Sequence, residues 1–451
     1  MSRYELLDEI DLPFPLGGCF GYWGYDLKNY VEPKLARRAV NDLELPDCSV
    51  GFYDSLVVFD HRLAKTWIVS TGLDVEGSRS EEKAHRQLGY WITKLRQARK
   101  VPDVLESITA IQLFGTTDPL DREGEPASSP PTRREWTVAP SPIPWRIRLP
   151  GEVGHVSSGA RPRHQSESSL PTKWDCHTRP IVSTFSRSDF IDAVECARRY
   201  IRAGDIYQVN LSQRLAGPCS LTGWDFFQRL TAVSPAPFAA FLDCGDVVIA
   251  SSSPERFLRV HDGRQVETRP IKGTRPRGVG PEHDAALALA LAESDKDRAE
   301  NVMIVDLLRN DLSRVCRPGT VRVPELFAIE HYATVHHMVS TVVGELAPEH
   351  DGVDLLRAAF PGGSITGAPK VRAMQIIAEL EPTARGAYCG AIGYVSVTGA
   401  LDTNIVIRTY LVLGRDVYFQ VGAGIVADSD PEQEYRETLD KARGLVAALT
   451  P

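Results

Sequence analysis

A lysine in an unusual setting is the first residue of this 451-residue sequence that could do chemistry. Lys272 lies in a Pro-Ile-Lys-Gly-Thr run, at the end of a strand predicted over residues 266–271. Three arginines lie close by in the sequence: Arg269, Arg275 and Arg277. Cationic neighbours and partial burial both disfavour an ammonium and lower a lysine's pKa. Such a lysine can act as a nucleophile or base near neutral pH, whereas a solvated lysine in a basic turn has no such role.

Two further residues are candidates for proton transfer. Glu255, in a Ser-Pro-Glu-Arg-Phe run, has the chemistry of a general acid, although an ion pair with Arg256 would explain it equally well. His337 is a candidate acid, base or orienting group, and the alternative is a hydrogen-bonded core histidine. Because His336 is adjacent, the two rings cannot point the same way on a strand or helix.

Paired carboxylates occur in the first turns of two predicted helices. Asp297 and Glu300 are three residues apart, as are Glu434 and Glu437, so each pair projects from one helix face. Lys441 lies on the same face as the second pair. Two such pairs suit a Mg²⁺ ion that keeps positions open for a carboxylate or phosphate ligand. Alternatively, the acids only complement the helix dipole.

Glycine-rich segments offer anion-binding backbone. Residues 362–370 read Gly-Gly-Ser-Ile-Thr-Gly-Ala-Pro-Lys and enter a helix, so exposed N–H groups can bind an anion. The segment is not an ATP-binding P-loop, because Ala-Pro stands where Lys-Ser/Thr is required. Gly422-Ala423-Gly424 provides a second set of donors, and Arg408, in a strand predicted over residues 405–412, is a candidate carboxylate clamp.

The elements that must position these residues alternate without a βαβ rhythm, which predicts an α+β fold. Helices are predicted over residues 80–100, 186–203, 297–315, 369–380 and 431–449, the last capped by Asp428 or Ser429. Strands are predicted over residues 55–59, 65–71, 205–215, 247–251, 266–271, 390–397, 405–412 and 417–421.

Composition narrows the class of protein. The net charge of -8 argues against nucleic acid or an anionic membrane as partner, and nothing approaches the length of a transmembrane helix. The eight cysteines lack zinc-site or disulfide-scaffold spacing, which predicts a cytoplasmic protein. We expect a β-rich region at 1–116, a Pro/Ser-rich, disordered insertion at 117–178 and a catalytic domain at 179–451.

Taken together, these segments resemble the chorismate-utilising enzymes, which include anthranilate synthase component I, aminodeoxychorismate synthase component I and the isochorismate and salicylate synthases. The matching stretches are residues 205–212, 253–257, 270–274, 294–311, 337–340, 360–370, 385–394, 402–409 and 421–441. The resemblance implies two stacked antiparallel sheets flanked by helices, with the active site between the sheets. Residues 1–116 resemble a shortened N-terminal domain of the family.

The resemblance also assigns roles. Mg²⁺ held by Asp297, Glu300, Glu434 and Glu437 would meet the carboxylates of chorismate. Most relatives have glutamate where Asp297 stands, so its coordination would pass through water. Substrate-binding roles would fall to Gln208, Thr366, Tyr394, Arg408, Gly422, Ala423, Gly424 and Lys441.

Two positions discriminate within the family. Enzymes that add water have lysine where Gln208 stands, so glutamine argues against isochorismate or salicylate synthase. Anthranilate synthases have alanine where Lys272 stands, whereas a subgroup of aminodeoxychorismate synthases has lysine. The resemblance to that subgroup implies that Lys272 attacks ring C2 while the C4 hydroxyl leaves. Glu255 would protonate the departing hydroxyl. Ammonia then attacks C4 and expels the lysine.

The sequence thus predicts aminodeoxychorismate synthase component I, with anthranilate synthase component I as the alternative. No glutaminase motif of Gly-x-Cys-x-Gly type is present, so ammonia should come from a separate class I glutaminase subunit or from free ammonium. Two hypotheses of other classes remain: a non-catalytic homologue that keeps the fold, and an unrelated Schiff-base lysine enzyme.

Overall fold

The computed structural model describes residues 14–61, 63–74, 76–97, 108–112, 175–176, 179–261 and 263–449. It divides into two compact units: unit 1 contains residues 1–20, 50–147 and 394–401, and unit 2 contains residues 21–49, 148–393 and 402–451. Residues 21–49 thereby join the unit that contains most of the predicted catalytic domain. Apart from the strand Asp175–Cys176, the predicted insertion at 117–178 lies outside the described residues.

The described strands are β1 (Gly18–Trp23), β2 (Cys48–Tyr53), β3 (Ser55–Asp60), β4 (Lys65–Ser70), β5 (Ile108–Gln112), β6 (Asp175–Cys176), β7 (Arg179–Pro180), β8 (Val182–Ser183), β9 (Gln208–Pro218), β10 (Phe238–Asp243), β11 (Val248–Ser253), β12 (Arg256–His261), β13 (Gln265–Arg269), β14 (Ile271–Pro276), β15 (Arg322–His331), β16 (Val335–Glu345), β17 (Gly367–Ala368), β18 (Ala391–Ser396), β19 (Leu401–Ile405), β20 (Thr409–Leu413) and β21 (Asp416–Ile425). The described α-helices are α1 (Lys28–Val31), α2 (Glu81–Gln97), α3 (Arg187–Arg202), α4 (Gly223–Val233), α5 (Pro281–Ala292), α6 (Asp295–Ser313), α7 (Gly352–Ala359), α8 (Lys370–Leu380) and α9 (Pro431–Val446).

Two sheets form the core of the chain's architecture. Among the described residues, a nine-stranded sheet has the order β14-β16-β13-β12-β19-β18-β1-β2, with β15 also paired to β16, and a seven-stranded sheet has the order β10-β11-β20-β21-β9-β17, with β8 paired to β9. The pairs β13–β16, β14–β16, β9–β21 and β9–β17 are all antiparallel. The predicted α+β class with two antiparallel sheets is confirmed.

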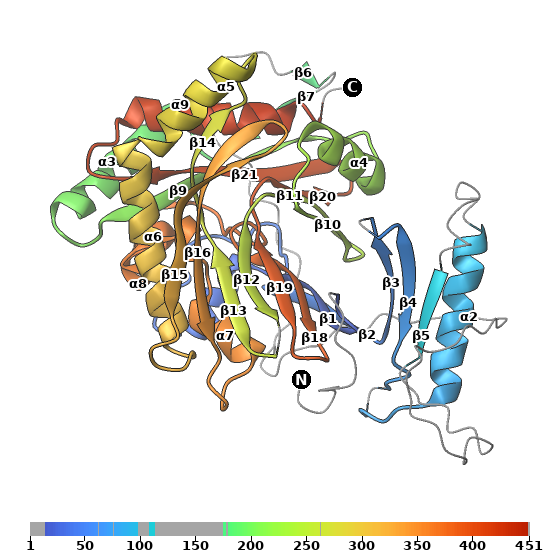
Figure 1. Cartoon of the computed structure of the whole chain (residues 1–451). Coiled ribbons are helices and arrows are strands. Elements are labelled where there is room, and N and C mark those ends of the chain that lie inside the picture. The colour runs from blue at the N-terminus through green and yellow to red at the C-terminus, as the bar shows by residue number, and fades with distance from the viewer. Residues whose placement is uncertain are drawn as a thin grey trace, which may run out of the picture. The chain divides into compact units, whose positions relative to one another are not determined.

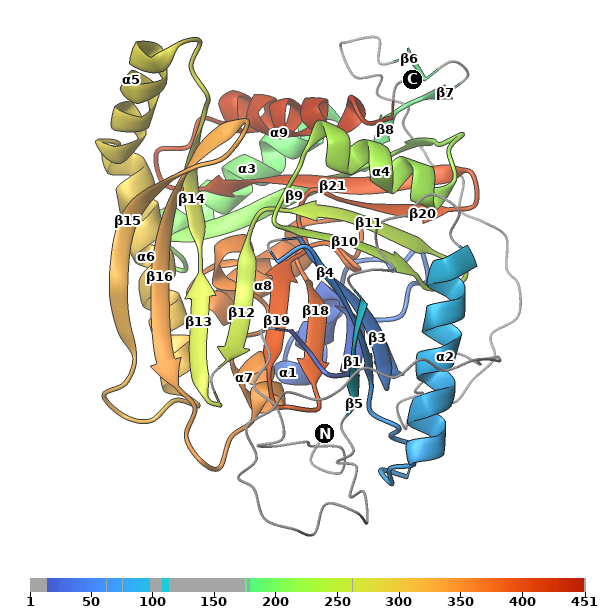
Figure 2. The same ribbon diagram turned by 45° about the vertical axis from the view of Figure 1, so that its right-hand side comes forward.

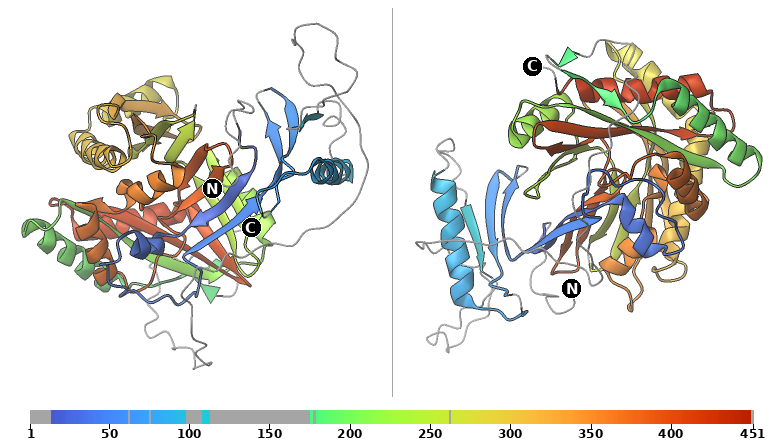
Figure 3. Two further views of the ribbon diagram at one scale, coloured as in Figure 1. Left: turned by 90° about the horizontal axis from the view of Figure 1, so that it is seen from below. Right: turned by 180° about the vertical axis from the view of Figure 1, so that it is seen from behind.

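Helices cover the outer side of the seven-stranded sheet in unit 2. Helix α9 packs against β21, α3 packs against α9 and β9, and α4 packs against β11 (Figure 1). The view from behind in Figure 3 shows the red helix α9 lying along the same sheet. Helices α5 and α6 lie beside β14, β15 and β16, as Figure 2 shows. The apolar cluster under α4 and α9 includes Phe226, Tyr410 and Phe419, which hold this layer together by burial of aromatic surface.

Helix starts follow local capping chemistry and correct two predictions. Helix α6 begins two residues earlier than predicted, because the Ser294 side chain accepts a hydrogen bond from the Asp297 backbone amide. Helix α9 is capped by Asp430, which accepts from Gln433, rather than by Asp428 or Ser429. The Ser429 hydroxyl instead donates to Glu434, so it is engaged within the predicted metal site.

The strand predicted over residues 405–412 is interrupted. Strand β19 ends at Ile405 and β20 begins at Thr409, and Arg408 between them has a φ of 50°, which a regular strand cannot accommodate. The strand predicted over 266–271 is also divided, because Pro270 has no N–H to give to the ladder. Strands β13 and β14 therefore pair one after the other along β16.

Unit 1 contains a smaller sheet of order β3-β4-β5 with α2 packed against it. Strands β3 and β4 are antiparallel, which confirms the predicted strand pair, and α2 confirms the predicted helix over 80–100 within a few residues. Its core includes Leu16, Val69 and Leu73. Among the described residues of the whole chain, no helix is both long and apolar enough to cross a membrane.

Candidate active site

Lys272 lies in a β-bulge of β14. Ile271 pairs with Val339 and Thr274 with His337, so the register shifts by one residue across Lys272 and Gly273. A bulge bends its strand and re-aims the side chains at that point, and Gly273 permits it with a φ of 87°. The lysine is therefore the second residue of a new strand, not the last residue of the predicted one.

The half-buried Lys272 ammonium donates a hydrogen bond to the Ser364 main-chain oxygen at 3.1 Å. Burial lowers the pKa of Lys272, and the positive charge of Lys441 acts in the same direction, while Glu300 and Glu255 oppose it. The lowered pKa and the contribution of burial were both expected, but the cationic neighbour is Lys441 and not the arginines adjacent in sequence.

The three arginines near Lys272 in sequence are engaged elsewhere: Arg269 pairs with Glu330, Arg275 with Asp297 and Arg277 with Asp284. Their charges are balanced by those acids, so burial is the larger influence on the lysine.

Glu255 lies between β11 and β12 and is 5% exposed. Burial raises the pKa of its carboxyl to about 7, although hydrogen bonds from the Ser364 hydroxyl and the Ile271 amide, and the charge of Lys272, act in the opposite direction. A carboxyl that titrates near neutrality is suited to general acid catalysis. The alternative partner, Arg256, pairs with Glu267 and Asp402 instead.

The two adjacent histidines point to different surroundings, as predicted. His337 is buried, and its Nδ1 lies 2.9 Å from the Thr274 hydroxyl. Burial and the charge of Arg408 lower the pKa of His337 to about 4, so the ring is neutral at physiological pH. His336 lies against Asp284, with 2.9 Å between Nε2 and the carboxylate. Only His337 thus lies within the electrostatic influence of other predicted site residues.

Arg408 is held on the turn between β19 and β20, and its half-buried guanidinium has no salt bridge within the described part of the chain. Burial lowers its pKa, and no neighbouring carboxylate offsets that effect. A desolvated guanidinium without a counter-ion favours an anionic ligand that can complete the pair. This arrangement supports the prediction of a carboxylate clamp.

The predicted anion-binding backbone lies on β21 and the loop before β17. Gly422 and Gly424 pair with Ser212 and Asn210 of β9, and a Cβ on Gly424 would come within 2.3 Å of the Gln208 side-chain nitrogen. A side chain at position 424 would therefore displace the Gln208 amide from its present place. Ala423 is buried between these glycines. Thr366 is buried as well, and its hydroxyl donates to the Gly362 carbonyl at 2.9 Å.

Buried acceptors without a protein partner lie on the same face of β9. The side-chain oxygens of Gln208 and Asn210, two residues apart, are both buried and lack a hydrogen-bond partner. An orphaned buried acceptor is costly unless a ligand or water satisfies it. These two oxygens therefore indicate a position beside the glycines of β21 where a hydrogen-bond donor of a ligand or water can bind.

The two acidic helices bring their carboxylates within electrostatic reach of one another. Burial raises the pKa of Glu300 and of Glu434, and the charge of Glu437 adds to both effects. Glu437 itself has a lowered pKa despite its burial, because Lys441 lies 2.7 Å away. Carboxylates that repel one another in this way favour a cation between them.

The structure nevertheless shows no group of three or more acidic, cysteine or histidine side chains converged enough to hold a metal ion among the residues it describes. Three of the four predicted ligands have other partners: Asp297 with Arg275, Glu434 with Ser429 and Glu437 with Lys441. The donor chemistry fits Mg²⁺, and the metal site stays a prediction.

Lys441 and Gly273 connect the acidic helices α6 and α9 to the strands that carry the other predicted site residues. The Lys441 ammonium donates to the Gly422 carbonyl at 2.9 Å while it pairs with Glu437, so it joins α9 to the glycines of β21. A Cβ on Gly273 would lie 2.9 Å from the Asp297 Cγ. The bulge that carries Lys272 therefore lies directly against Asp297, in the first turn of α6.

Tyr394 belongs to unit 1, where its ring packs against Phe20 with 5.4 Å between centroids. Its assignment to substrate binding stays a prediction. Tyr388, the other tyrosine of the family-matching stretch 385–394, is buried within unit 2.

Sequence reasoning missed two residues that build the site. Ser364, inside the glycine-rich loop, contacts both Glu255 and Lys272. Arg385 forms a buried ion pair with Glu381, and its guanidinium also donates to the Ile365 and Asn210 carbonyls at 3.0 and 2.8 Å. The only available signal was that both lie in stretches matching the family.

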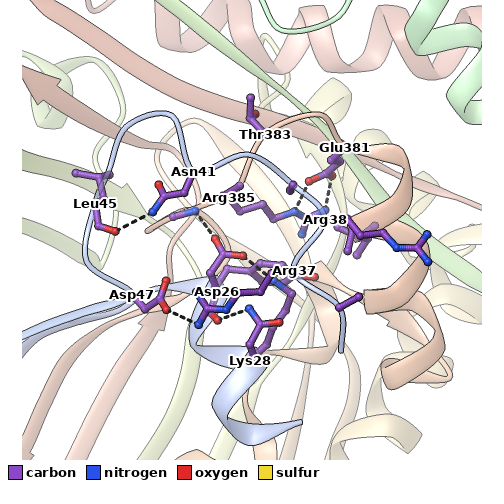
Figure 4. A pocket seen from close by; sticks show the side chains of 18 residues that line it. Asp26, Lys28, Arg37, Arg38, Asn41, Leu45, Asp47, Glu381, Thr383 and Arg385 are labelled. Atoms are coloured by element: carbon purple, nitrogen blue, oxygen red, sulfur yellow. Dashed lines mark hydrogen bonds and ion pairs between the residues drawn. The ribbon is translucent and has the colours of Figure 1, made fainter. Parts of the chain in front are cut away.

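The Glu381–Arg385 pair also lines a hollow of about 600 Å³ that is open to solvent (Figure 4). Figure 4 also shows Arg37 bonded to Asp47 in the same hollow. None of the described residues predicted to bind substrate, metal or proton lines it, so this hollow is not the predicted site.

Comparison with known proteins decides the family. A family model described as chorismate binding enzyme matches residues 152–447. The chain belongs to this family. It is 39% identical to aminodeoxychorismate synthase component 1 of Klebsiella aerogenes over 438 residues, covering 97% of this chain and 78% of the relative. It is also 39% identical to anthranilate synthase component 1 of Thermus thermophilus over 439 residues, covering 97% and 79%.

A solved structure agrees. The crystal structure of anthranilate synthase component I from Streptococcus pneumoniae aligns with a TM-score of 0.72 and 30% identity, covering 99% of this chain and 84% of that one. This chorismate-binding protein therefore has the fold that its sequence predicted.

Proposed function

We propose that this chorismate-binding protein is aminodeoxychorismate synthase component I, which converts chorismate and ammonia to 4-amino-4-deoxychorismate for p-aminobenzoate and folate biosynthesis. Relatives with that name and relatives named anthranilate synthase component 1 share the same 39% identity with the chain. The choice between them therefore rests on one observation. Lys272 is half-buried and has a lowered pKa, and it lies beside Glu255, whose pKa is about 7. According to the resemblance, anthranilate synthases have alanine at this position.

A lowered pKa increases the fraction of Lys272 that is the neutral, nucleophilic amine. In the proposed reaction its nitrogen forms a bond to ring C2, the ring double bonds shift, and the C4–O bond breaks. Glu255 supplies the proton with which the C4 hydroxyl leaves as water. Ammonia then forms a bond to C4, the double bonds shift back, and the C2–N bond to Lys272 breaks, which restores the lysine. The proton that the new C4 ammonium loses returns to the Glu255 carboxylate and restores the acid.

Substrate placement falls to residues that lack a protein counter-ion or that present backbone donors. The Arg408 guanidinium would bind a chorismate carboxylate, and the glycines of β21 with Thr366 would flank the ring. His337, neutral near pH 7, would give or accept a hydrogen bond without adding charge. Gln208 brings no basic amine to the site, which is consistent with ammonia rather than activated water as the incoming group.

Mg²⁺ is the cation that the acidic helices would hold, through Glu300, Glu434 and Glu437 directly and Asp297 through water. When bound, the ion would neutralise a carboxylate of the substrate and the mutual repulsion of these acids. Support comes from the raised pKa values of Glu300 and Glu434. Chelation with EDTA should abolish turnover, and added Mg²⁺ should restore it.

We also propose a separate class I glutaminase subunit as the ammonia source and a cytoplasmic location. The name "component 1" of the relatives supports the existence of a further component. The location is supported by cysteine spacing that fits no disulfide scaffold.

Product identification tests the function. The protein, incubated with chorismate, Mg²⁺ and ammonium, should yield 4-amino-4-deoxychorismate without pyruvate. Direct appearance of fluorescent anthranilate, with one pyruvate per turnover, would establish the alternative. Failure to consume chorismate even with a glutaminase partner present would support a non-catalytic homologue.

A further inference from the structure

We propose that Ser364 is a positioning residue that holds the acid Glu255 and the amine of Lys272 in one fixed relation during amine transfer. This inference rests on the proposed function, because that function makes Glu255 the proton donor and Lys272 the nucleophile.

The geometry is that of one residue with two catalytic neighbours. The Ser364 main-chain oxygen accepts a hydrogen bond from the Lys272 ammonium at 3.1 Å, and its hydroxyl is hydrogen-bonded to the Glu255 carboxyl. Lys272 belongs to the nine-stranded sheet, whereas Ser364 lies in a short 3-10 helix (Gly363–Ile365) that leads into β17 of the seven-stranded sheet. Because the carbonyl and the hydroxyl belong to the same residue, its covalent geometry limits how far Glu255 and Lys272 can move relative to each other.

The loop that carries Ser364 is fixed on both sides of it. The Ile365 carbonyl accepts from Arg385 at 3.0 Å, and the Thr366 carbonyl accepts from the Asn210 amide at 2.8 Å. The Thr366 hydroxyl donates back to Gly362 at 2.9 Å. Ser364 itself is buried. Such support from a surrounding shell is what a positioning group needs in order to act on its neighbours.

The hydrogen bonds that Ser364 forms with Lys272 and with Glu255 act on different steps of the proposed reaction. A neutral Lys272 amine that donates one N–H to the Ser364 carbonyl keeps its lone pair directed away from that carbonyl. Once Glu255 has given its proton to the departing hydroxyl, it becomes a carboxylate that the Ser364 hydroxyl stabilises. The charged group acting on Glu255 from another element is Lys272, whose attraction also favours the carboxylate.

Ser364→Ala removes the hydroxyl and leaves the carbonyl. With ammonium as nitrogen donor we expect kcat to fall by about 10- to 100-fold, the effect of one hydrogen bond to a charged group, with KM for chorismate changed by less than about threefold. The hydrogen bond from Ser364 lowers the pKa of Glu255, so its loss should raise that pKa. The alkaline limb of the kcat–pH profile, where Glu255 loses its proton, should therefore move to higher pH. Ser364→Thr keeps a hydroxyl and should restore both kcat and the position of that limb.

Circular dichroism and thermal unfolding establish that each variant is folded. Wild-type kcat and an unmoved pH profile in Ser364→Ala would overturn the proposal, as would equal losses in the alanine and threonine variants, which would indicate packing alone. The proposed function is judged separately on the wild-type product. If that product is anthranilate, the function proposal fails, while the ratio of variant to wild-type turnover still tests Ser364.

Discussion

Glu255→Gln should make the free energy of unfolding less dependent on pH. Burial raises the pKa of the carboxyl from 4.5 to about 7. In the unfolded chain it returns to about 4.5, so between these values the native state holds a proton that the unfolded state has released. Native stability therefore falls as pH rises through this window and stays reduced above it. At about 1.36 kcal/mol per pKa unit the full loss is about 3.4 kcal/mol, of which roughly 2.5 kcal/mol develops between pH 5 and 8.

Glutamine has nearly the same shape and does not titrate, so the variant lacks this loss. Denaturant unfolding of wild type and variant at pH 5, 6, 7 and 8 measures the difference in unfolding free energy at each pH. Any constant cost of the substitution cancels across the series, and so does the titration of His337, which both proteins share. We expect the difference to move by roughly 2.5 kcal/mol in favour of the variant between pH 5 and 8. A difference that is the same at every pH would refute the argument that Glu255 titrates near neutrality.

Three further substitutions test other parts of the site. Lys272→Ala should lower aminodeoxychorismate formation by at least about 100-fold while KM for chorismate changes little, and near-normal turnover would exclude covalent catalysis. Gly273→Ala should destabilise the protein by about 1–3 kcal/mol in denaturant unfolding, because φ is 87° and the added Cβ would meet Asp297 at 2.9 Å. Gly280→Ala, also at 87° but in open space, is its matched control and should cost less. Arg408→Lys should raise KM for chorismate by about tenfold or more, since lysine cannot give two parallel hydrogen bonds, and an unchanged KM would place the carboxylate elsewhere.

The fold class was predictable because hydrophobic periodicity and turn chemistry are local. Helix α3 shows this: it is predicted over residues 186–203 and spans Arg187–Arg202, with the Ser186 side chain as its N-cap. The bulge at Lys272 could not be predicted from the sequence, because it depends on how β14 pairs with β16, some 65 residues away. The interruption at Arg408 has the same origin, since propensity alone favours a continuous strand there.

Residue types suggested which groups could do chemistry, but not what surrounds them. The arginines beside Lys272 in sequence were predicted to be its electrostatic neighbours, but the fold pairs each of them with an acid. Ser364 carried no signal of its own, because a serine in a glycine-rich loop is ordinarily only a turn residue. Its contacts arise from the approach of two sheets, which no single stretch of sequence encodes.

The bulge in β14 has a consequence for how this family can change products. Its backbone depends on Gly273, which supplies the positive φ and the close approach to Asp297, whereas the Lys272 side chain is hydrogen-bonded to Ser364, outside the bulge. An alanine at position 272 can therefore occupy the same backbone without rearrangement. The gain or loss of the amine at position 272 therefore needs no change in the backbone of β14, so the side chain that distinguishes the two proposed product classes can be exchanged on an unchanged scaffold.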